Sequence, residues 1–338
     1  MPHAEDLDYI WGLIDEEGAA PDELRVRESE EYEIAGHSVI FAVDNGQNRL
    51  LLIPVAPGTR IQEDKRSSGV QIASRQMIDG STLRAFLTVV CLKPHLNPLF
   101  SIIAAEIIER LQFDVSAPDM TAQQVLNRWR DLLERAPSEM PSREVLIGAF
   151  GELYTLKQIV QHEPDALRFW VGADRARHDF LAKSAALEVK TTTDRSRLYV
   201  TIRGHDQLEP PTNGKLYLAL LRLERVGTGG NSLFDLVEAI ISMGADRVLL
   251  MIQLAKLDIT QDVLNKMKDD RYVVRDELVY LVDEQFPRLT SVSFVGGRLP
   301  ERISTITYQI DLSAQPPHPL SSEQIQVIFK QLASEASS

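Results

Sequence analysis

Four consecutive segments between residues 37 and 92 are rich in Val, Ile, Leu, Phe and Thr, residue types that pack well in strands. Short turn signals separate them, as at Asp44-Asn45-Gly46 and Asp79-Gly80. Because short turns join antiparallel neighbours, these segments predict an antiparallel sheet. The expected strands are 37–43, 49–55, 69–77 and 81–92.

Two helices are expected to complete this part of the chain, at 98–111 and 121–134. In the second, Val125, Trp129 and Leu132 recur at helical spacing. Prolines at 137 and 141 then interrupt the chain. Because 338 residues correspond to about two domains, we predict an amino-terminal β-rich domain over 1–136 and a second domain over 137–338.

The second part alternates helices and strands, which is typical of an α/β (α+β) protein. Helices are expected at 142–161, with Ser142 as the cap, and at 233–243 and 260–268. Strands are expected at 178–182, 186–191, 197–203, 215–225, 247–252, 278–282 and 303–312.

Charge is unevenly distributed along the chain, whose formal net charge is -13. Residues 1–35 carry 12 acidic and two basic side chains, whereas residues 175–203 carry seven basic and three acidic ones. The negative net charge of the whole chain argues against a protein that coats nucleic acid with a uniformly basic surface. The basic centre would neutralise phosphates, unless it only discourages aggregation at a sheet edge. The acidic lead is expected to be solvated and partly disordered, with docking of a basic partner and mimicry of phosphate as alternatives.

The single cysteine, Cys91, excludes an internal disulfide and a cysteine-only zinc site. The first residues are acidic where a secretory signal is basic. The best candidate for a membrane span, 85–92, is far shorter than the roughly 20 residues that a spanning helix needs. A protein of the reducing cytoplasm without a membrane partner is therefore expected.

One segment combines two carboxylates with a lysine: His-Asp-Phe at 178–180 is followed by Leu-Glu-Val-Lys at 187–190. Side chains alternate along a strand, so Glu188 and Lys190 share one face. If a tight turn at Lys183-Ser184 joins the two strands, residues whose numbers sum to 367 lie opposite each other, and Asp179 faces Glu188. Lys-Ser is a poor turn pair, so this register is a hypothesis.

Two carboxylates opposed across a hairpin repel each other unless a cation lies between them. Hard oxygen ligands favour Mg²⁺ or Mn²⁺. Such an ion would polarise a phosphoryl oxygen and lower the pKa of a bound water, while Lys190 would orient that water or stabilise developing charge. The alternative is a solvated hairpin face on which Asp179, Glu188 and Lys190 form a cross-strand ion pair.

The preceding helix contributes a third carboxylate. Glu152 shares a face with Val145, Ala149 and Leu156 at helical offsets. Within an apolar stripe, a carboxylate needs a metal, a lysine or a donor as its partner, unless it reaches solvent at the edge of the stripe. Gly148 and Gly151 weaken this helix and would be tolerated if they allowed close approach to another backbone.

The order of these residues, a helix with Glu152, a strand with Asp179 and a strand with Glu188-Val189-Lys190, resembles the PD-(D/E)XK nuclease superfamily. More narrowly, the chain is similar to an uncharacterised bacterial family of PD-(D/E)XK-motif proteins found in phage-defence and restriction-like gene clusters. The Phe-Gly-Glu-Leu helix, the segment 170–180 and the run 204–208 carry this likeness, and the motifs span 143–225.

The resemblance implies a restriction-endonuclease-like mixed sheet flanked by helices. It also implies Asp179 and Glu188 as ligands of Mg²⁺ or Mn²⁺, Lys190 as the catalytic lysine and Glu152 as a further acidic residue near the metal. One departure is that His178 stands where the motif has proline, which weakens the family label more than the chemistry.

Residues around this site are candidates for contacting substrate, although Gln207 would serve equally well as a helix cap or surface residue. The candidates are Arg177, His178, Arg195, Arg197 and Gln207. We expect a Mg²⁺-dependent deoxyribonuclease of a phage-defence or restriction-like system. The alternatives are an inactive nuclease-fold subunit that binds DNA or scaffolds a defence complex, and a generic α/β protein with a charged hairpin. DNA is the expected partner, and further subunits and a homodimer stay open.

Overall fold

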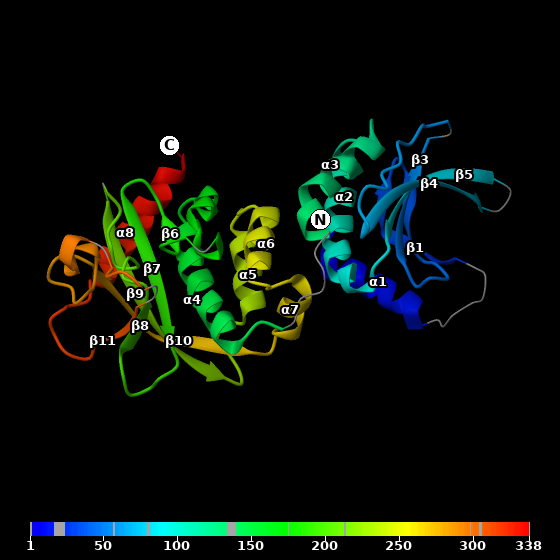
Figure 1. Ribbon diagram of the computed structural model, residues 1–338. Coiled ribbons are helices and arrows are strands. Elements are labelled where there is room, and N and C mark those ends of the chain that lie inside the picture. Colours follow the sequence, from blue (N-terminus) through cyan, green and yellow to red (C-terminus); the bar gives the residue numbers. More distant parts are fainter. Residues whose placement is uncertain are drawn as a thin grey trace. The chain divides into compact units, whose positions relative to one another are not determined.

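The computed structural model describes residues 2–16, 24–56, 58–79, 82–133, 140–174, 176–212, 214–297, 299–303 and 306–337. The chain forms two compact units, Met1–Pro137 and Ser138–Ser338 (Figure 1). The boundary predicted at 136/137, the turn residue Gly80 and the basic residue Arg175 lie outside the described residues. No helix in the described ranges is both long and apolar enough to cross a membrane.

The amino-terminal unit contains the predicted antiparallel sheet, with strand order β1-β2-β3-β5-β4. The strands are β1 (Arg25–Ile34), β2 (His37–Val43), β3 (Arg49–Val55), β4 (Val70–Asp79) and β5 (Thr82–Cys91). The helices of this unit are α1 (Ala4–Glu16), α2 (Asn97–Phe113) and α3 (Pro118–Leu133). The inner strands β2 and β3 are continuous apolar runs because they are buried along most of their length.

Much of the acidic lead is folded, so the expectation of a solvated, partly disordered lead is wrong for α1 and β1. In α1, Leu7, Trp11 and Ile14 recur at helical offsets and are fully buried. In β1, Tyr32 and Ile34 are buried while the glutamates are exposed. The carboxylates lie on the solvent-exposed faces of an amphipathic helix and of an edge strand. A high density of charge is therefore compatible with a folded segment here.

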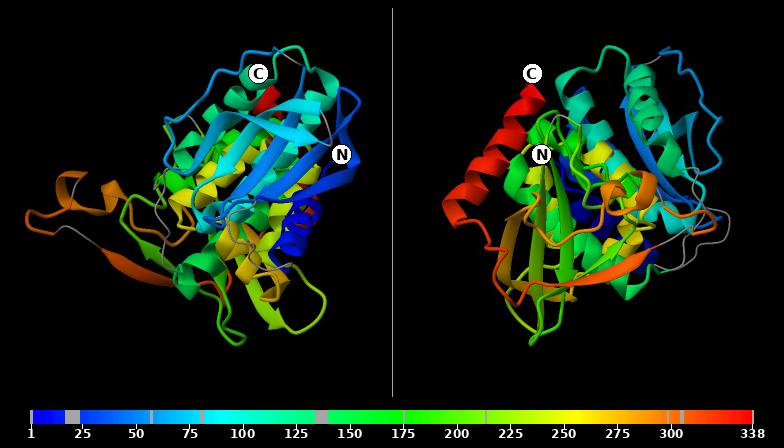
Figure 2. Two further views of the ribbon diagram at one scale, coloured as in Figure 1. Left: turned by 90° about the vertical axis from the view of Figure 1, so that its right-hand side faces the viewer. Right: turned by 60° about the vertical axis from the view of Figure 1, so that its left-hand side comes forward.

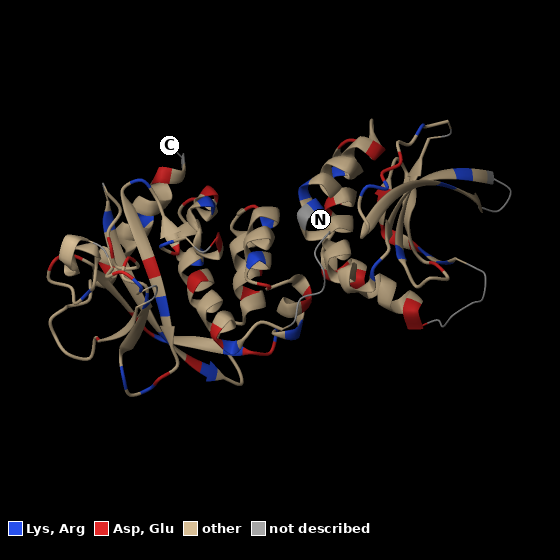
Figure 3. Ribbon diagram, in the orientation of Figure 1, with Lys and Arg blue, Asp and Glu red and all other residues tan. Residues whose placement is uncertain are grey.

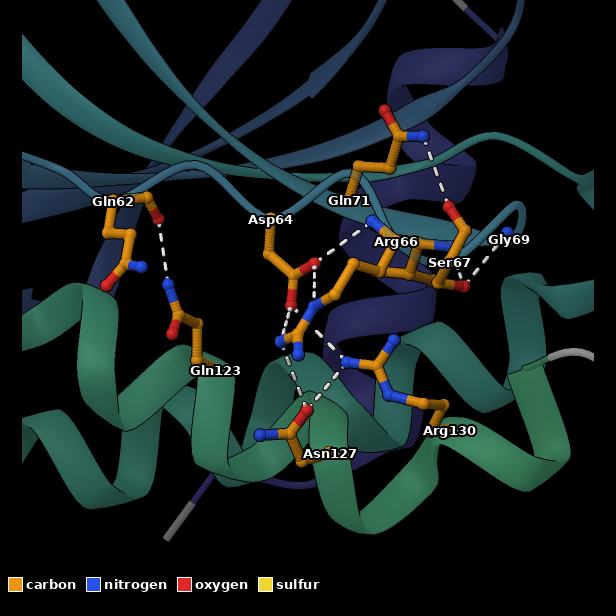
Figure 4. Close-up of polar contacts among 10 residues, drawn as sticks. Gln62, Asp64, Arg66, Ser67, Gly69, Gln71, Gln123, Asn127 and Arg130 are labelled. Atoms are coloured by element: carbon orange, nitrogen blue, oxygen red, sulfur yellow. Dashed lines mark hydrogen bonds and ion pairs between the residues drawn. The ribbon is translucent and has the colours of Figure 1, made fainter.

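A loop between β3 and β4 is fastened to α3 by polar side chains (Figure 4). The buried carboxylate of Asp64 accepts a hydrogen bond from Arg66 Nε at 2.9 Å and another from Arg130 at 3.3 Å. Hydrogen bonds from Arg66 hold the pKa of Asp64 well below its usual range, although burial opposes this shift. Gln123 Nε2 also donates to the carbonyl of Gln62 at 2.9 Å. Hydrogen bonds to charged groups therefore hold this loop in place.

The carboxy-terminal unit contains the mixed sheet flanked by helices that the resemblance implies. Its strand order is β10-β9-β7-β6, with β7 and β9 parallel and the outer pairs antiparallel, and β8 and β11 form a separate antiparallel pair. The strands are β6 (Phe180–Leu181), β7 (Ala185–Thr192), β8 (Tyr199–Arg203), β9 (Lys215–Val226), β10 (Arg271–Leu281) and β11 (Thr307–Asp311). The helices are α4 (Arg143–Val160), α5 (Leu233–Ser242), α6 (Arg247–Lys256), α7 (Gln261–Lys266) and α8 (Ser322–Ser334).

The four-stranded sheet is covered on both faces. On one face, Leu216, Leu218 and Leu220 of β9 pack with Val200 and Ile202 of β8. On the other face, α4 lies against β7, and α5 packs on α4 (Figures 1 and 2). Of the predicted site residues, Glu152 lies on α4, and Glu188 and Lys190 lie on β7.

The two glycines of α4 have different roles. A Cβ at Gly151 would overlap Cγ2 of Thr191 on β7, so glycine is required for the close approach of the helix to the sheet. A Cβ at Gly148 would meet no atom within 4 Å. Close approach, the condition under which both glycines would be tolerated, therefore holds for Gly151 and not for Gly148.

The strand predicted at 247–252 is wrong, because this segment is helix α6. Asp246 caps the helix by accepting a hydrogen bond from the backbone N–H of Leu249 at 3.0 Å. Val248, Met251 and Leu254 are buried. A short apolar run does not distinguish a buried strand from a buried helix, and the cap decides here.

Candidate active site

The hairpin β6–β7 has the predicted register. Phe180 lies opposite Leu187 and Leu181 opposite Ala186, so the paired numbers sum to 367. The turn consists of Lys183 and Ser184, whose backbone N–H groups donate to the carboxylate of Glu335 at 2.6 and 3.2 Å. This distant carboxylate explains how a poor turn pair is accommodated, and nothing in the hairpin's own sequence points to it.

The hairpin brings Asp179, Glu188 and Lys190 together. Asp179 Oδ2 accepts a hydrogen bond from the backbone N–H of Val189 at 2.7 Å, which ties the start of β6 to the middle of β7. Glu188 is only 1 % exposed, and its Oε1 lies 2.5 Å from Lys190 Nζ. Its Oε2 is buried and has no hydrogen-bond partner among the described residues. Figure 3 shows the acidic and basic residues next to each other on β7.

The third predicted carboxylate, Glu152 of α4, is held by a residue that sequence reasoning missed. The indole N–H of Trp170 donates to Glu152 Oε2 at 2.7 Å. Trp170 is fully buried, and its carbonyl accepts a hydrogen bond from Gln253 of α6 at 3.3 Å. The segment 170–180 was noticed for its likeness to the family, but a contact that spans 18 residues has no local sequence signal.

Gly172 is the second residue that sequence reasoning missed. A Cβ at this position would lie 2.7 Å from Glu152 Oε2 and 2.8 Å from Asp179 Oδ1, so both carboxylate oxygens border the space that glycine leaves empty. The backbone N–H groups of Val171 and Gly172 also donate to the carbonyl of Asp179, at 2.8 and 3.0 Å. The loop 170–172 therefore holds the two acidic residues from one side.

Burial raises the pKa of each of these carboxyl groups. The pKa of Glu152 lies well above its usual value because of burial and the neighbouring charge of Asp179. Burial raises the pKa of Asp179 against the opposing charge of Lys190. Burial, followed by the charge of Asp179, raises the pKa of Glu188 to about 8. Three acidic groups beside one lysine therefore favour bound protons or a cation near neutral pH.

The donor set fits a hard divalent cation. Carboxylate oxygens are the ligands that Mg²⁺ and Mn²⁺ prefer, and the unpartnered Oε2 of Glu188 is a coordination position without a competing hydrogen bond. Within the described part of the chain, no three His, Cys, Asp or Glu side chains are grouped so that they could hold a metal by themselves. Mg²⁺ usually binds through one or two carboxylates, with water and substrate phosphate as its other ligands.

These residues line an open pocket of about 730 Å³ between α4, β7 and β8. Glu152, Asp179, Glu188 and Lys190 all contribute to its walls. Glu152 and Asp179 keep some accessible surface because they border the pocket, although protein atoms surround them on nearly all sides. The acidic residues therefore border the pocket while they stay poorly hydrated.

Two of the five predicted substrate contacts line this pocket. Gln207 Oε1 accepts hydrogen bonds from Lys190 Nζ at 3.3 Å and from the backbone N–H of Arg203 at 3.0 Å. Arg197 lies on the pocket wall just before β8. Gln207 thus orients the lysine, which distinguishes it from a helix cap or a surface residue.

The structure does not bring the other three residues to the pocket. Arg177 pairs with Asp206 at 3.5 Å, and Arg195 pairs with Glu224 at 2.8 Å. His178 is buried, and burial, together with the charge of Arg177, lowers its pKa. The backbone of residues 209 and 207 opposes this shift, and the buried Nε2 of the ring has no hydrogen-bond partner among the described residues.

Comparison with known proteins gives one result. No curated protein and no solved structure matches the chain. Residues 7–313 match the family described as "Putative PD-(D/E)XK family member, (DUF4420)". The match covers both units and includes every residue of the pocket. The chain belongs to this PD-(D/E)XK family, and the resemblance indicated by the order of Glu152, Asp179, Glu188 and Lys190 is thereby confirmed.

Proposed function

We propose that the protein is a Mg²⁺-dependent nuclease that hydrolyses phosphodiester bonds of DNA, with Mn²⁺ as a substitute. One observation carries the proposal: a buried Glu188 with an unpartnered oxygen lies beside Asp179 and is paired with Lys190 in an open pocket. A buried carboxylate oxygen without a partner destabilises a fold, so its presence favours a role in binding or chemistry. A place in a phage-defence or restriction-like system is supported by the family resemblance alone.

Each side chain of the pocket has a role in this proposal. Asp179 and Glu188 would hold the metal, which supplies charge stabilisation to the phosphoryl group and lowers the pKa of a bound water. Lys190 is positioned by Glu188 and Gln207, so that its N–H groups can orient the attacking water and stabilise negative charge on the phosphate. Glu152 would complete the acidic site. In its deprotonated form, which a bound cation favours against the effect of burial on its pKa, it would accept the proton that this water loses.

Cleavage assays on supercoiled, linear and single-stranded DNA with Mg²⁺ or Mn²⁺ test the proposal. Lys190→Ala and Asp179→Ala should each lower the cleavage rate by about 100-fold or more, because the first removes a positive charge beside the reacting phosphate and the second removes a proposed metal ligand. Lys215→Ala is the matched control, since Lys215 is an exposed lysine of the same unit that lies at the start of β9. Cleavage that survives in both site variants would show that this pocket is not the active site.

A second candidate is an inactive nuclease-fold subunit that binds DNA or scaffolds a defence complex. The observation that favours it is the direct ion pair between Glu188 and Lys190, which can neutralise one buried carboxylate without a metal. Calorimetric titration with Mn²⁺ separates the two candidates. Binding that disappears in Glu188→Gln supports the enzyme, whereas DNA binding without any metal binding supports the inactive subunit.

The proposal also includes DNA as the principal partner and a location in the reducing cytoplasm. Cys91, the single cysteine, is buried, and burial raises the pKa of its thiol to about 11, so it is a poor nucleophile. Other subunits and a homodimer remain predictions, which light scattering of the purified protein and co-purification would test.

A further inference from the structure

Strand β8 presents a polar face to the pocket. Side chains alternate along a strand, and Val200 and Ile202 are buried in the apolar cluster on one side. Tyr199, Thr201 and Arg203 alternate with them and line the pocket. This face lies beside the proposed catalytic lysine, because the same pocket contains Lys190.

Tyr199 is an aromatic ring placed within a charged pocket. Its side chain is 38 % exposed, and the guanidinium carbon of Arg197 lies 5.8 Å from the ring centroid. Tyr199 is paired across the two-stranded sheet with Asp311 of β11. The exposed ring is therefore accessible to a ligand in the pocket.

Arginines lie on both sides of Tyr199 along this face. Arg197 precedes the strand and Arg203 ends it, which separates them by about 20 Å at about 3.3 Å per residue. Arg203 pairs with Glu144 at 3.4 Å, but both side chains are largely exposed, so the pair is weak and can be exchanged for a phosphate. Between them, Thr201 is contacted by Gln309 of β11 at 3.4 Å.

We propose that this face of β8 binds an unpaired strand of DNA, with a base stacked on Tyr199 and flanking phosphates bound by Arg197 and Arg203. The inference rests on the proposed nuclease function and adds the form of the substrate. Bases of a duplex are stacked on one another and expose only their edges, so only an unpaired base can place its π-face on a protein ring. The DNA strand would then pass Lys190, and the nucleotide stacked on Tyr199 would be unpaired and close to the scissile phosphate.

Binding is measured by fluorescence anisotropy with labelled single-stranded and blunt duplex oligonucleotides, in EDTA so that no cleavage occurs. Tyr199→Ala should weaken single-strand binding by about 5- to 150-fold, which corresponds to the loss of one base–aromatic stack, and should barely change duplex binding. Tyr199→Phe keeps the ring and should bind the single strand within about threefold of the wild type. Tyr9→Ala is the matched control, because Tyr9 is 67 % exposed on α1 of the other unit.

The outcomes separate this inference from the proposed function. Equal single-strand binding by the wild type and Tyr199→Ala, or an equal loss in Tyr199→Phe and Tyr199→Ala, overturns the stacking site even if cleavage depends on Lys190. Loss of single-strand binding in Tyr199→Ala alone supports the stacking site even if no cleavage is found. A wild-type chain that binds neither oligonucleotide in EDTA overturns the stacking site, and one that also cleaves no DNA with Mg²⁺ or Mn²⁺ overturns both proposals. Melting curves of each variant confirm that it is folded.

Discussion

Replacing Gly172 with alanine should impair the acidic site while leaving most of the fold intact. The added Cβ would lie 2.7 Å from Glu152 Oε2, 2.8 Å from Asp179 Oδ1 and 3.2 Å from the Asp179 Cα. Both carboxylates would have to retreat by several tenths of an ångström to reach ordinary contact. Neither can move freely, because Trp170 holds Glu152 and the backbone N–H of Val189 holds Asp179.

The size of the effect follows from the packing. Forcing one methyl group into a packed site lowers the free energy of unfolding by about 1–3 kcal/mol. Displacing a catalytic group by about 1 Å lowers a reaction rate by about 100-fold, so a smaller shift should lower DNA cleavage by about 10- to 100-fold. The affinity for Mn²⁺, measured by calorimetric titration, should fall as well, because Asp179 is a proposed ligand. This second measurement does not depend on cleavage.

Gly227→Ala is the matched control for this substitution. Gly227 belongs to the same unit, and a Cβ there would meet no atom within 4 Å. It should keep the wild-type cleavage rate and Mn²⁺ affinity. If Gly172→Ala behaves like Gly227→Ala in both assays, the two carboxylates do not need the space beside Gly172, and the argument from close packing is refuted.

Two further predictions concern the pH dependence of stability. Folding raises the pKa of Glu188 from 4.5 to about 8, so the metal-free protein should lose stability as pH rises between these values. Glu188→Gln should therefore raise the melting temperature most above pH 8, and an equal change at pH 4 would contradict this. Asp64→Asn should lower the stability of the amino-terminal unit by about 2 kcal/mol at pH 7. The loss should shrink below pH 3.8, and an unchanged urea midpoint at pH 7 would show that the cluster contributes nothing.

Local rules predicted the part of the site that lies on neighbouring residues. The alternation of side chains placed Glu188 and Lys190 on one face of β7. The assumption of a tight turn at Lys183-Ser184 predicted the register of the hairpin. Contacts between distant residues were not predictable in this way. Trp170 with Glu152 and Glu335 with the hairpin turn depend on how whole elements pack, and neither leaves a pattern in a window of a few residues.

The two errors in predicting the fold have a common physical origin. In the acidic lead, the many carboxylates led to the prediction of disorder. The three apolar residues Leu7, Trp11 and Ile14 nevertheless form one buried stripe, which is enough to stabilise a helix. For residues 247–252, a strand was predicted from the apolar residues alone, without considering Asp246 as the cap of a helix. In both segments, the pattern of burial carried more information than the composition.

Burial also argues against the interpretation of the charged hairpin as a solvated face. A solvated face with a cross-strand ion pair would expose its carboxylates, but Glu188 is 1 % exposed and one of its oxygens has no partner. A buried ion pair rarely stabilises a fold better than apolar residues of the same size. The pocket also contains Glu152 and Asp179, whose pKa values are raised by the same burial. An arrangement that lowers stability and opens onto solvent is better explained by chemistry at the pocket than by a structural role for the hairpin.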